Sequence, residues 1–131
     1  MKIFIYAKKI TGPLELLQGV VEKVIPLCDI KKFNTSDALC QQLRRNTTSQ
    51  NYKTITILLI DAQNELQDLI ELRPLLAETR IILILPDKDP ETIRLGHTLF
   101  PRYLDFLDSS FTEVGEVLQK IKQASSAGAD Q

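Results

Sequence analysis

The chain has 131 residues, the size of one ordinary domain. Its 16 basic and 17 acidic side chains give a net charge of -1, without the basic excess that nucleic-acid binding normally requires. At 44% hydrophobic residues, and with no apolar run near the roughly 18 residues of a membrane span, the composition excludes disordered and membrane proteins. The first apolar stretch is too short for a signal peptide, so we expect a cytoplasmic protein.

Five short segments rich in apolar and β-branched residues predict five strands. The third and fourth are apolar without interruption, which is typical of strands buried on both faces of a parallel sheet. The predicted strands are 3–7, 27–33, 55–60, 81–85 and 103–107.

Apolar residues at helical spacing lie between these strands. Pro13 and Pro90 each stand at a first helical position, and Ser110 followed by Glu113 has the spacing of a capping box. The clearest apolar stripe belongs to the last helix: Val114, Val117, Leu118 and Ile121.

This alternation predicts an α/β fold of the (βα)5 type, a doubly wound parallel sheet with helices on both faces. Residues 1–124 form the predicted domain, and the small, polar residues 125–131 form a disordered tail or the start of a linker. Ligands of such sheets bind at the carboxyl ends of the strands, so any functional residues are expected there.

The motifs of common α/β enzymes are absent from these strand ends. There is no G-x-G-x-x-G, no G-x-x-x-x-G-K-[ST] and no G-x-S-x-G, and neither Cys28 nor Cys40 is followed by Arg at the spacing of a thiol phosphatase. The single His97 cannot complete a zinc tetrad with the two cysteines, which we interpret as buried, reduced thiols. The sequence therefore predicts neither an enzyme nor a bound cofactor.

The pattern resembles the receiver domains of bacterial two-component response regulators over nearly the whole chain. The segment ILLID at 57–61 is similar to the third receiver strand with its phosphorylated Asp, IILIL at 81–85 to the fourth strand, and DFLDSSF at 105–111 to the receiver segment D-Y-L-V-K-P-F. The resemblance implies a flavodoxin-like sandwich with strand order 2-1-3-4-5, and it places Asp61 at the phosphoacceptor position.

Several groups that the resemblance assigns to phosphotransfer are replaced. Lys8 and Lys9 stand in place of the acid pair that helps to hold Mg²⁺, Pro86 in place of a hydroxyl, and Ser109 in place of a lysine. Because Mg²⁺ prefers several oxygen ligands, Asp61 beside two ammonium groups is a poor metal site, and this pattern indicates a pseudo-receiver without metal. The predicted pocket is lined by Lys8, Lys9, Pro86, Asp87 and Ser109.

Two of these features have alternative interpretations. An ammonium group from Lys8 or Lys9 takes the place of Mg²⁺ beside Asp61, or both lysines are solvated loop charges. Asp87 and Asp89 have the spacing of a metal pair, but Asp89 before a proline is better explained as a helix cap.

Three functions remain open. The leading hypothesis is a non-catalytic signalling or scaffold module that binds a protein partner or a second copy of itself, without nucleic acid or membrane. The alternatives are an atypical receiver phosphorylated at Asp61, which alone would need Mg²⁺, and a small enzyme on a flavodoxin-like scaffold. The fourth helix has two apolar sides, and a twisted or short helix would bury both, whereas the resemblance implies that Leu95 and Leu99 turn inward. The interaction face would then be formed by Ile93, His97, Phe100 and Phe106.

Overall fold

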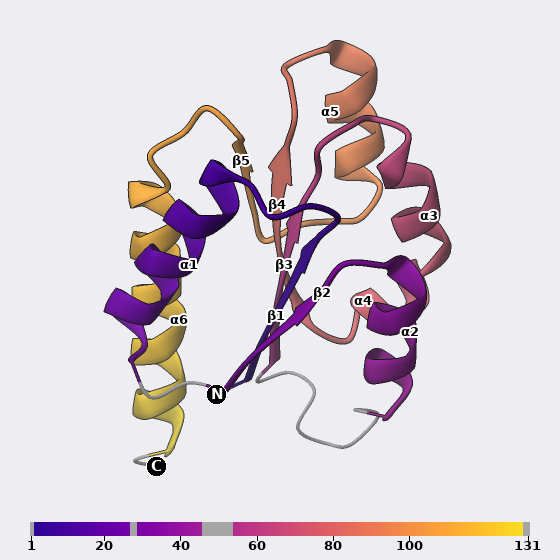
Figure 1. The fold of residues 1–131 in the computed structure, drawn as a ribbon. Coiled ribbons are helices and arrows are strands. Elements are labelled where there is room, and N and C mark those ends of the chain that lie inside the picture. Colours follow the sequence, from indigo (N-terminus) through magenta and orange to yellow (C-terminus); the bar gives the residue numbers. More distant parts are fainter. Residues whose placement is uncertain (1, 27–28, 46–53, 130–131) are drawn as a thin grey trace.

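The structure is a computed structural model that describes residues 2–26, 29–45 and 54–129, with side chains up to residue 124. Five parallel strands form one sheet in the order β2-β1-β3-β4-β5, which confirms the predicted flavodoxin-like topology (Figure 1). The strands are β1 (Lys2–Ala7), β2 (Asp29–Phe33), β3 (Thr54–Leu59), β4 (Arg80–Leu85) and β5 (Tyr103–Phe106).

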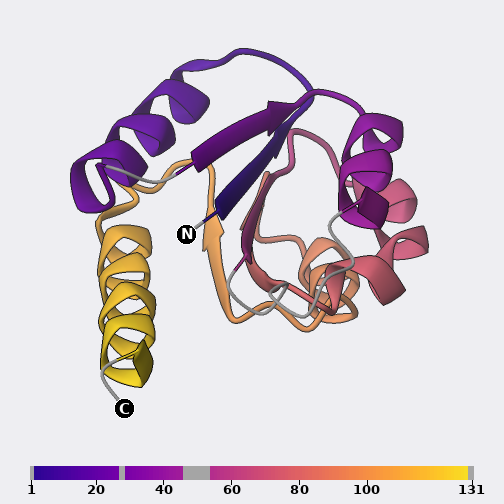
Figure 2. The same cartoon turned by 90° about the horizontal axis from the view of Figure 1, so that it is seen from below.

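Helices cover both faces of the sheet, as the unbroken apolar strands require (Figures 1 and 2). On one face lie α1 (Gly12–Val24) and α6 (Thr112–Ala129). On the other lie α2 (Ser36–Arg45), α3 (Glu65–Glu71), α4 (Arg73–Leu76) and α5 (Pro90–His97). Strand residues alternate between the two cores, so that Ile3 and Ile5 face α1 and α6 while Phe4 and Tyr6 face α2 to α5.

Helix starts follow the predicted signals in two places and depart from them in a third. Thr11 caps α1 by accepting a hydrogen bond from the backbone N–H of Leu14 (3.4 Å), and Asp89 caps α5 through the N–H of Glu91 (2.9 Å). The predicted capping box before α6 is wrong. The Ser110 hydroxyl instead bonds to that of Thr112, and the Glu113 carboxylate accepts the hydroxyl of Tyr103.

The third helical segment is divided into α3 and α4, a break that the apolar spacing does not predict. Pro74 lies in the first turn of α4, where its missing N–H costs no hydrogen bond. The helix α5 packs closely against β4 at Gly96. A Cβ atom added there would lie only 2.9 Å from Cδ2 of Leu83, so a side chain at this position would clash with the strand.

The helix α6 buries Val114, Leu118 and Ile121, as its apolar stripe predicts, and includes residues 125–129 of the predicted tail.

No helix in the described ranges is long and apolar enough to cross a bilayer. Cys40 is a half-buried free thiol, whereas Cys28 lies outside the described residues.

Candidate functional site

The carboxyl end of β3 carries two acids in contact. Asp61 follows the strand, and the first turn of α3 brings Glu65 back beside it, where Oε2 of Glu65 accepts a hydrogen bond from the N–H of Asp61 (3.3 Å). Glu65 is only 6% exposed. Burial raises the pKa of the Glu65 carboxyl, and the charge of Asp61 adds to this effect, whereas the Asp61 N–H and the two nearby lysines act in the opposite direction.

Tyr6 on β1 belongs to the same acidic site. Its ring is buried in the core beneath α2 to α5. Burial raises the pKa of the Tyr6 hydroxyl to about 12, with contributions from the negative charges of Glu65, Asp68 and Asp61. The site therefore concentrates the negative charges of Asp61, Glu65 and Asp68 around the phenol of Tyr6.

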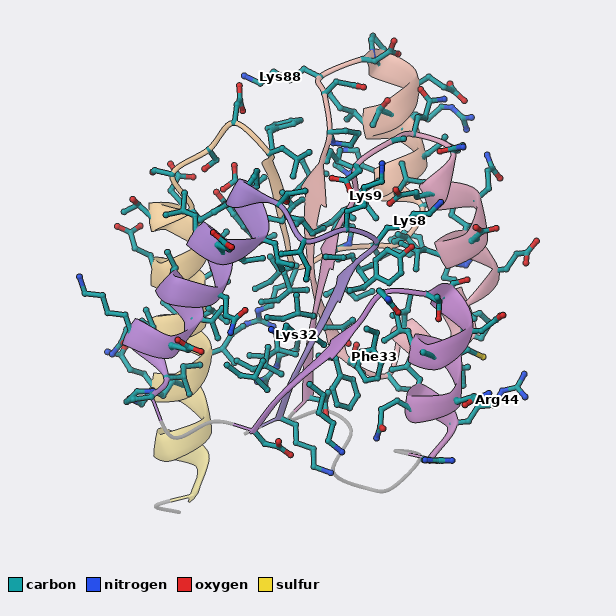
Figure 3. All side chains as sticks on the ribbon, in the orientation of Figure 1. Lys8, Lys9, Lys32, Phe33, Arg44 and Lys88 are labelled. Carbon is teal, nitrogen blue, oxygen red and sulfur yellow. The ribbon has the colours of Figure 1, made fainter. Side chains whose placement is uncertain are left out.

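Lys8 and Lys9 follow β1 on the loop toward α1, where Figure 3 labels them, and both side chains are exposed. Neither forms an ion pair with Asp61, so the predicted replacement of Mg²⁺ by an ammonium group is wrong for this structure. An exposed ammonium keeps its hydration, which a close contact with the half-buried carboxylate would remove. The two lysines act through space on Glu65 instead, by lowering its pKa.

Pro86 and Asp87 follow β4, beside the end of β3 that carries Asp61, and they line a groove of about 480 Å³ at the carboxyl ends of β4 and β5. Lys88 crosses this groove, with its ammonium 5.2 Å from the ring centre of Phe106. Oδ1 of Asp87 accepts the N–H of Asp89 (3.0 Å), so the proposed metal pair serves to shape the loop before α5. Among the described residues, no three His, Cys, Asp or Glu side chains form a group that could hold a metal ion.

Ser109 holds the turn after β5 together. Its Oγ donates to Oδ2 of Asp105 (2.9 Å) and accepts the N–H of Phe111 (2.9 Å). Ser109 does not line the groove of Pro86 and Asp87. The strand registers, with Ala7 beside Leu59 and Leu59 beside Ile84, bring Lys9, Asp61 and Pro86 to the same edge of the sheet. That the predicted residues line a single pocket stays a prediction.

One hydrogen bond links the loop that follows Asp61 to α5. The hydroxyl of Thr92, a fully buried residue in the first turn of α5, donates to Oε1 of Gln63 (3.0 Å), two residues after Asp61. The sequence analysis missed this contact, and it also missed Glu65, Tyr6 and Lys88. Glu65 could have been predicted, because it stands four residues after Asp61, about one helical turn, and this spacing brings the two acids close together.

The four residues of the predicted interaction face lie on α5, after it and on β5, and α5 is turned as expected. Leu95 and Leu99 are buried against the sheet, while Ile93 is half-buried and His97 is exposed. Phe100 is 80% exposed and has φ 51°, in the left-handed region, because the chain leaves α5 after His97 and turns toward β5. The fourth residue of this face, Phe106, is half-buried under Lys88.

Comparison with known proteins supports the fold. No family model matches the chain, and no curated protein matches its sequence. Among solved structures, the chain is similar to a crystal structure from Burkholderia thailandensis E264 that carries the name of a pilus assembly protein, CpaE. The TM-score is 0.63 at 12% sequence identity, and the match covers 94% of this chain and 98% of the other. At this identity, the likeness establishes a shared architecture.

Proposed function

We propose that this chain is a receiver-like signalling or scaffold module that acts through protein–protein contacts and carries out no phosphotransfer. The observation that carries the proposal is Phe100, a large aromatic side chain that is 80% exposed on a strained backbone at the end of α5. The structural neighbour is named for pilus assembly, and a role in an assembly of proteins is the kind of role we propose here.

The surroundings of Asp61 support the absence of phosphotransfer. A phosphoryl group on Asp61 would add negative charge beside the buried carboxylate of Glu65, and it would need cations to offset that charge. Lys8 and Lys9 after β1 are the nearby cations, and both are exposed, while the predicted phosphoryl contacts after β4 and β5 supply little. Pro86 has no hydroxyl, and Ser109 is already bonded to Asp105.

A direct test of phosphorylation uses acetyl phosphate with Mg²⁺ and the intact mass of the protein. We expect no added phosphoryl group on the wild type. A mass increase that is present in the wild type and absent from Asp61→Asn would contradict the proposal and establish the atypical receiver instead. Beryllofluoride with Mg²⁺ should likewise leave the melting temperature unchanged, because a ligand that binds the folded state would raise it.

A second experiment tests the contact surface with the matched pair Phe100→Ser and Leu16→Ser. Leu16 is 49% exposed on α1, outside the interaction face, so both variants remove an exposed apolar side chain. We expect the wild type and Leu16→Ser to self-associate in sedimentation velocity, or to capture the same protein from an extract of the source organism. Phe100→Ser should lose that contact. A strictly monomeric wild type that captures nothing would reject the interaction face.

A further inference from the structure

A groove of about 450 Å³ lies between β2 and the first half of α1, and we call it the β2 groove. It is at the edge of the sheet opposite the interaction face, so the proposed function does not use it. Its apolar floor includes Ile5, Ala7 and Leu14, all of them buried, and Ile10 lines it with a side chain that is 85% exposed. The volume is within the roughly 300 to 1,000 Å³ that is typical of pockets for small molecules.

Two side chains of opposite charge line the β2 groove. Glu15 comes from the first turn of α1 and Lys32 from β2, and both are exposed. In the part of the chain that the structure describes, neither of them forms an ion pair, with each other or with a third residue. The other polar residues of the lining, Gln18 and Asn34, are neutral. The groove thus combines an apolar floor with one unpaired carboxylate and one unpaired ammonium group.

Hydrogen bonds hold the ammonium group of Lys32 on the side of β2 that faces α1. It donates to Oε1 of Gln18 (3.2 Å), and the amide of Gln18 donates in turn to Glu22 (3.2 Å), which does not line the groove. Lys32 lies on the α1 side of β2, and Phe33 lies on the opposite side (Figure 3). Glu15 precedes Gln18 by three residues and therefore shares its side of the helix. The positive charge is thus on the strand side of the groove and the negative charge on the helix side.

We propose that the β2 groove binds a small aliphatic zwitterion, the chemistry shared by a free amino acid and a short peptide with both ends free. The ammonium group of the ligand lies beside Glu15, its carboxylate beside Lys32, and its aliphatic side chain on the apolar floor. Lys32 can bind the carboxylate without losing Gln18, because an ammonium group has three N–H donors. A ligand with a single charge fits less well, since it leaves one charge of the groove unpaired and is repelled by the other.

The test titrates four small molecules into the ¹⁵N-labelled wild type. They are L-leucine, leucylleucine, 4-methylpentanoate (leucine without its ammonium group) and 3-methylbutylamine (leucine without its carboxylate). We expect amide shifts around Ile10, Leu14 and Lys32, with millimolar affinity for the zwitterions and about fivefold weaker binding of each analogue with one charge. The tighter of leucine and leucylleucine identifies the source of the zwitterion.

Variants of the two charged residues test each contact separately. Glu15→Gln should weaken leucine binding by about three- to fivefold, but should not weaken binding of 4-methylpentanoate, which has no ammonium group. Lys32→Gln should weaken leucine binding by a similar factor, but not binding of 3-methylbutylamine. The matched controls are Glu71→Gln on α3 and Lys31→Gln on the other side of β2, which should change leucine binding by less than about twofold.

The aliphatic part of the ligand is tested by Ile10→Ser, which should weaken leucine binding, with Leu16→Ser as the matched control. Glycine, which has no side chain, should show no detectable binding. Glu15, Lys32 and Ile10 are all exposed, so circular dichroism should show native folding in their variants.

Several outcomes would overturn the proposal. They are the absence of leucine and leucylleucine binding up to their solubility limits, equal binding of glycine, and shifts confined to the interaction face. Binding of 4-methylpentanoate as tight as that of leucine would assign the groove to an anionic amphiphile instead, and equally tight binding of 3-methylbutylamine would assign it to a cationic one.

Discussion

The turns at the two ends of β5 each contain a phenylalanine with a left-handed backbone. Phe100 before the strand has φ 51°, and Phe111 after it has φ 62°. This conformation costs an ordinary residue roughly 1 to 2 kcal/mol. Phe111 is 0% exposed, within the core between the sheet, α1 and α6, whereas Phe100 is 80% exposed. The two turns thus share a strained backbone and differ in what their side chains contact.

The difference shows how strain can be compensated inside or outside a monomer. Full burial of a phenylalanine contributes about 2 to 3 kcal/mol, which is enough to offset the strain at Phe111. Phe100 gains little from burial within this chain, although its N–H does donate to the carbonyl of His97 (3.0 Å). The proposed function would place the compensating contact of Phe100 on a partner.

The largest expected difference is in the free energy of unfolding when each of the two phenylalanines is replaced by Ala. Phe111→Ala should lower the free energy of unfolding by about 3 to 5 kcal/mol, because it leaves a cavity in the core. Phe100→Ala should change it by less than about 0.5 kcal/mol, as for other exposed sites. Urea unfolding of both variants measures this difference, and equal losses would invalidate the comparison.

A smaller effect on the free energy of unfolding is expected at Glu65 in the acidic site. It depends on pH, and substitutions at Phe100 or Phe111 should not change it. The pKa of Glu65 is raised in the folded state, so the stability it contributes is full below about pH 4.5, the range of an ordinary Glu, and is lost as pH rises through the folded-state pKa. Glu65→Gln should therefore be more stable than the wild type near neutral pH and lose this advantage in acid. Urea unfolding at several pH values measures this. The control is Glu71→Gln, at an exposed position of α3, and parallel profiles for wild type and Glu65→Gln would contradict the prediction.

Relief of strain at the exposed turn should have a still smaller effect on stability. Asn tolerates the left-handed region better than Phe, so Phe100→Asn should raise the free energy of unfolding by up to about 1 kcal/mol while it weakens association. Thermal unfolding and sedimentation of the same preparation test the two effects together. A destabilised Phe100→Asn would show that the aromatic ring supports the monomer.

The smallest expected effect concerns Lys88 above Phe106, close to the buried turn. Lys88→Gln should cost about 0.5 to 1 kcal/mol, the value of an exposed cation–π contact. Lys120→Gln, at an exposed lysine of α6 without an aromatic partner in the described residues, serves as the control. Equal unfolding free energies for the two variants would show that the ring contact contributes nothing.

The sequence pattern was sufficient for the sheet, because uninterrupted apolar strands need cover on both faces. It was not sufficient for the inward side of α5, which has two apolar sides. The resemblance to receivers selected Leu95 and Leu99, and both are buried. The break between α3 and α4 was not predictable in this way, because a short helix is stabilised by its contacts more than by its apolar spacing.

The candidate site was predicted less well, since it depends on which polar groups the packing brings together. Asp61 was correctly placed at a strand end, but Glu65 looked like an ordinary first-turn acid and is buried only because α3 packs against the sheet. Ser109 was identified by what it replaces, whereas its observed bonds to Asp105 and Phe111 depend on the shape of one turn. The groove of about 450 Å³ between α1 and the edge strand β2 depends on how far the helix lies from the sheet, which periodicity does not encode.

The hydrogen bond from Thr92 to Gln63 sets an upper limit on long-range communication by this route. It connects the loop after Asp61 to the helix that precedes Phe100. A single bond of this kind contributes about 0.5 to 1.5 kcal/mol, so its loss would shift the balance between two positions of α5 by about tenfold at most. An all-or-none switch between those positions requires roughly ten-thousandfold discrimination. Through this bond alone, events at Asp61 could therefore modulate the occupancy of a partner on the interaction face, but could not turn it on or off.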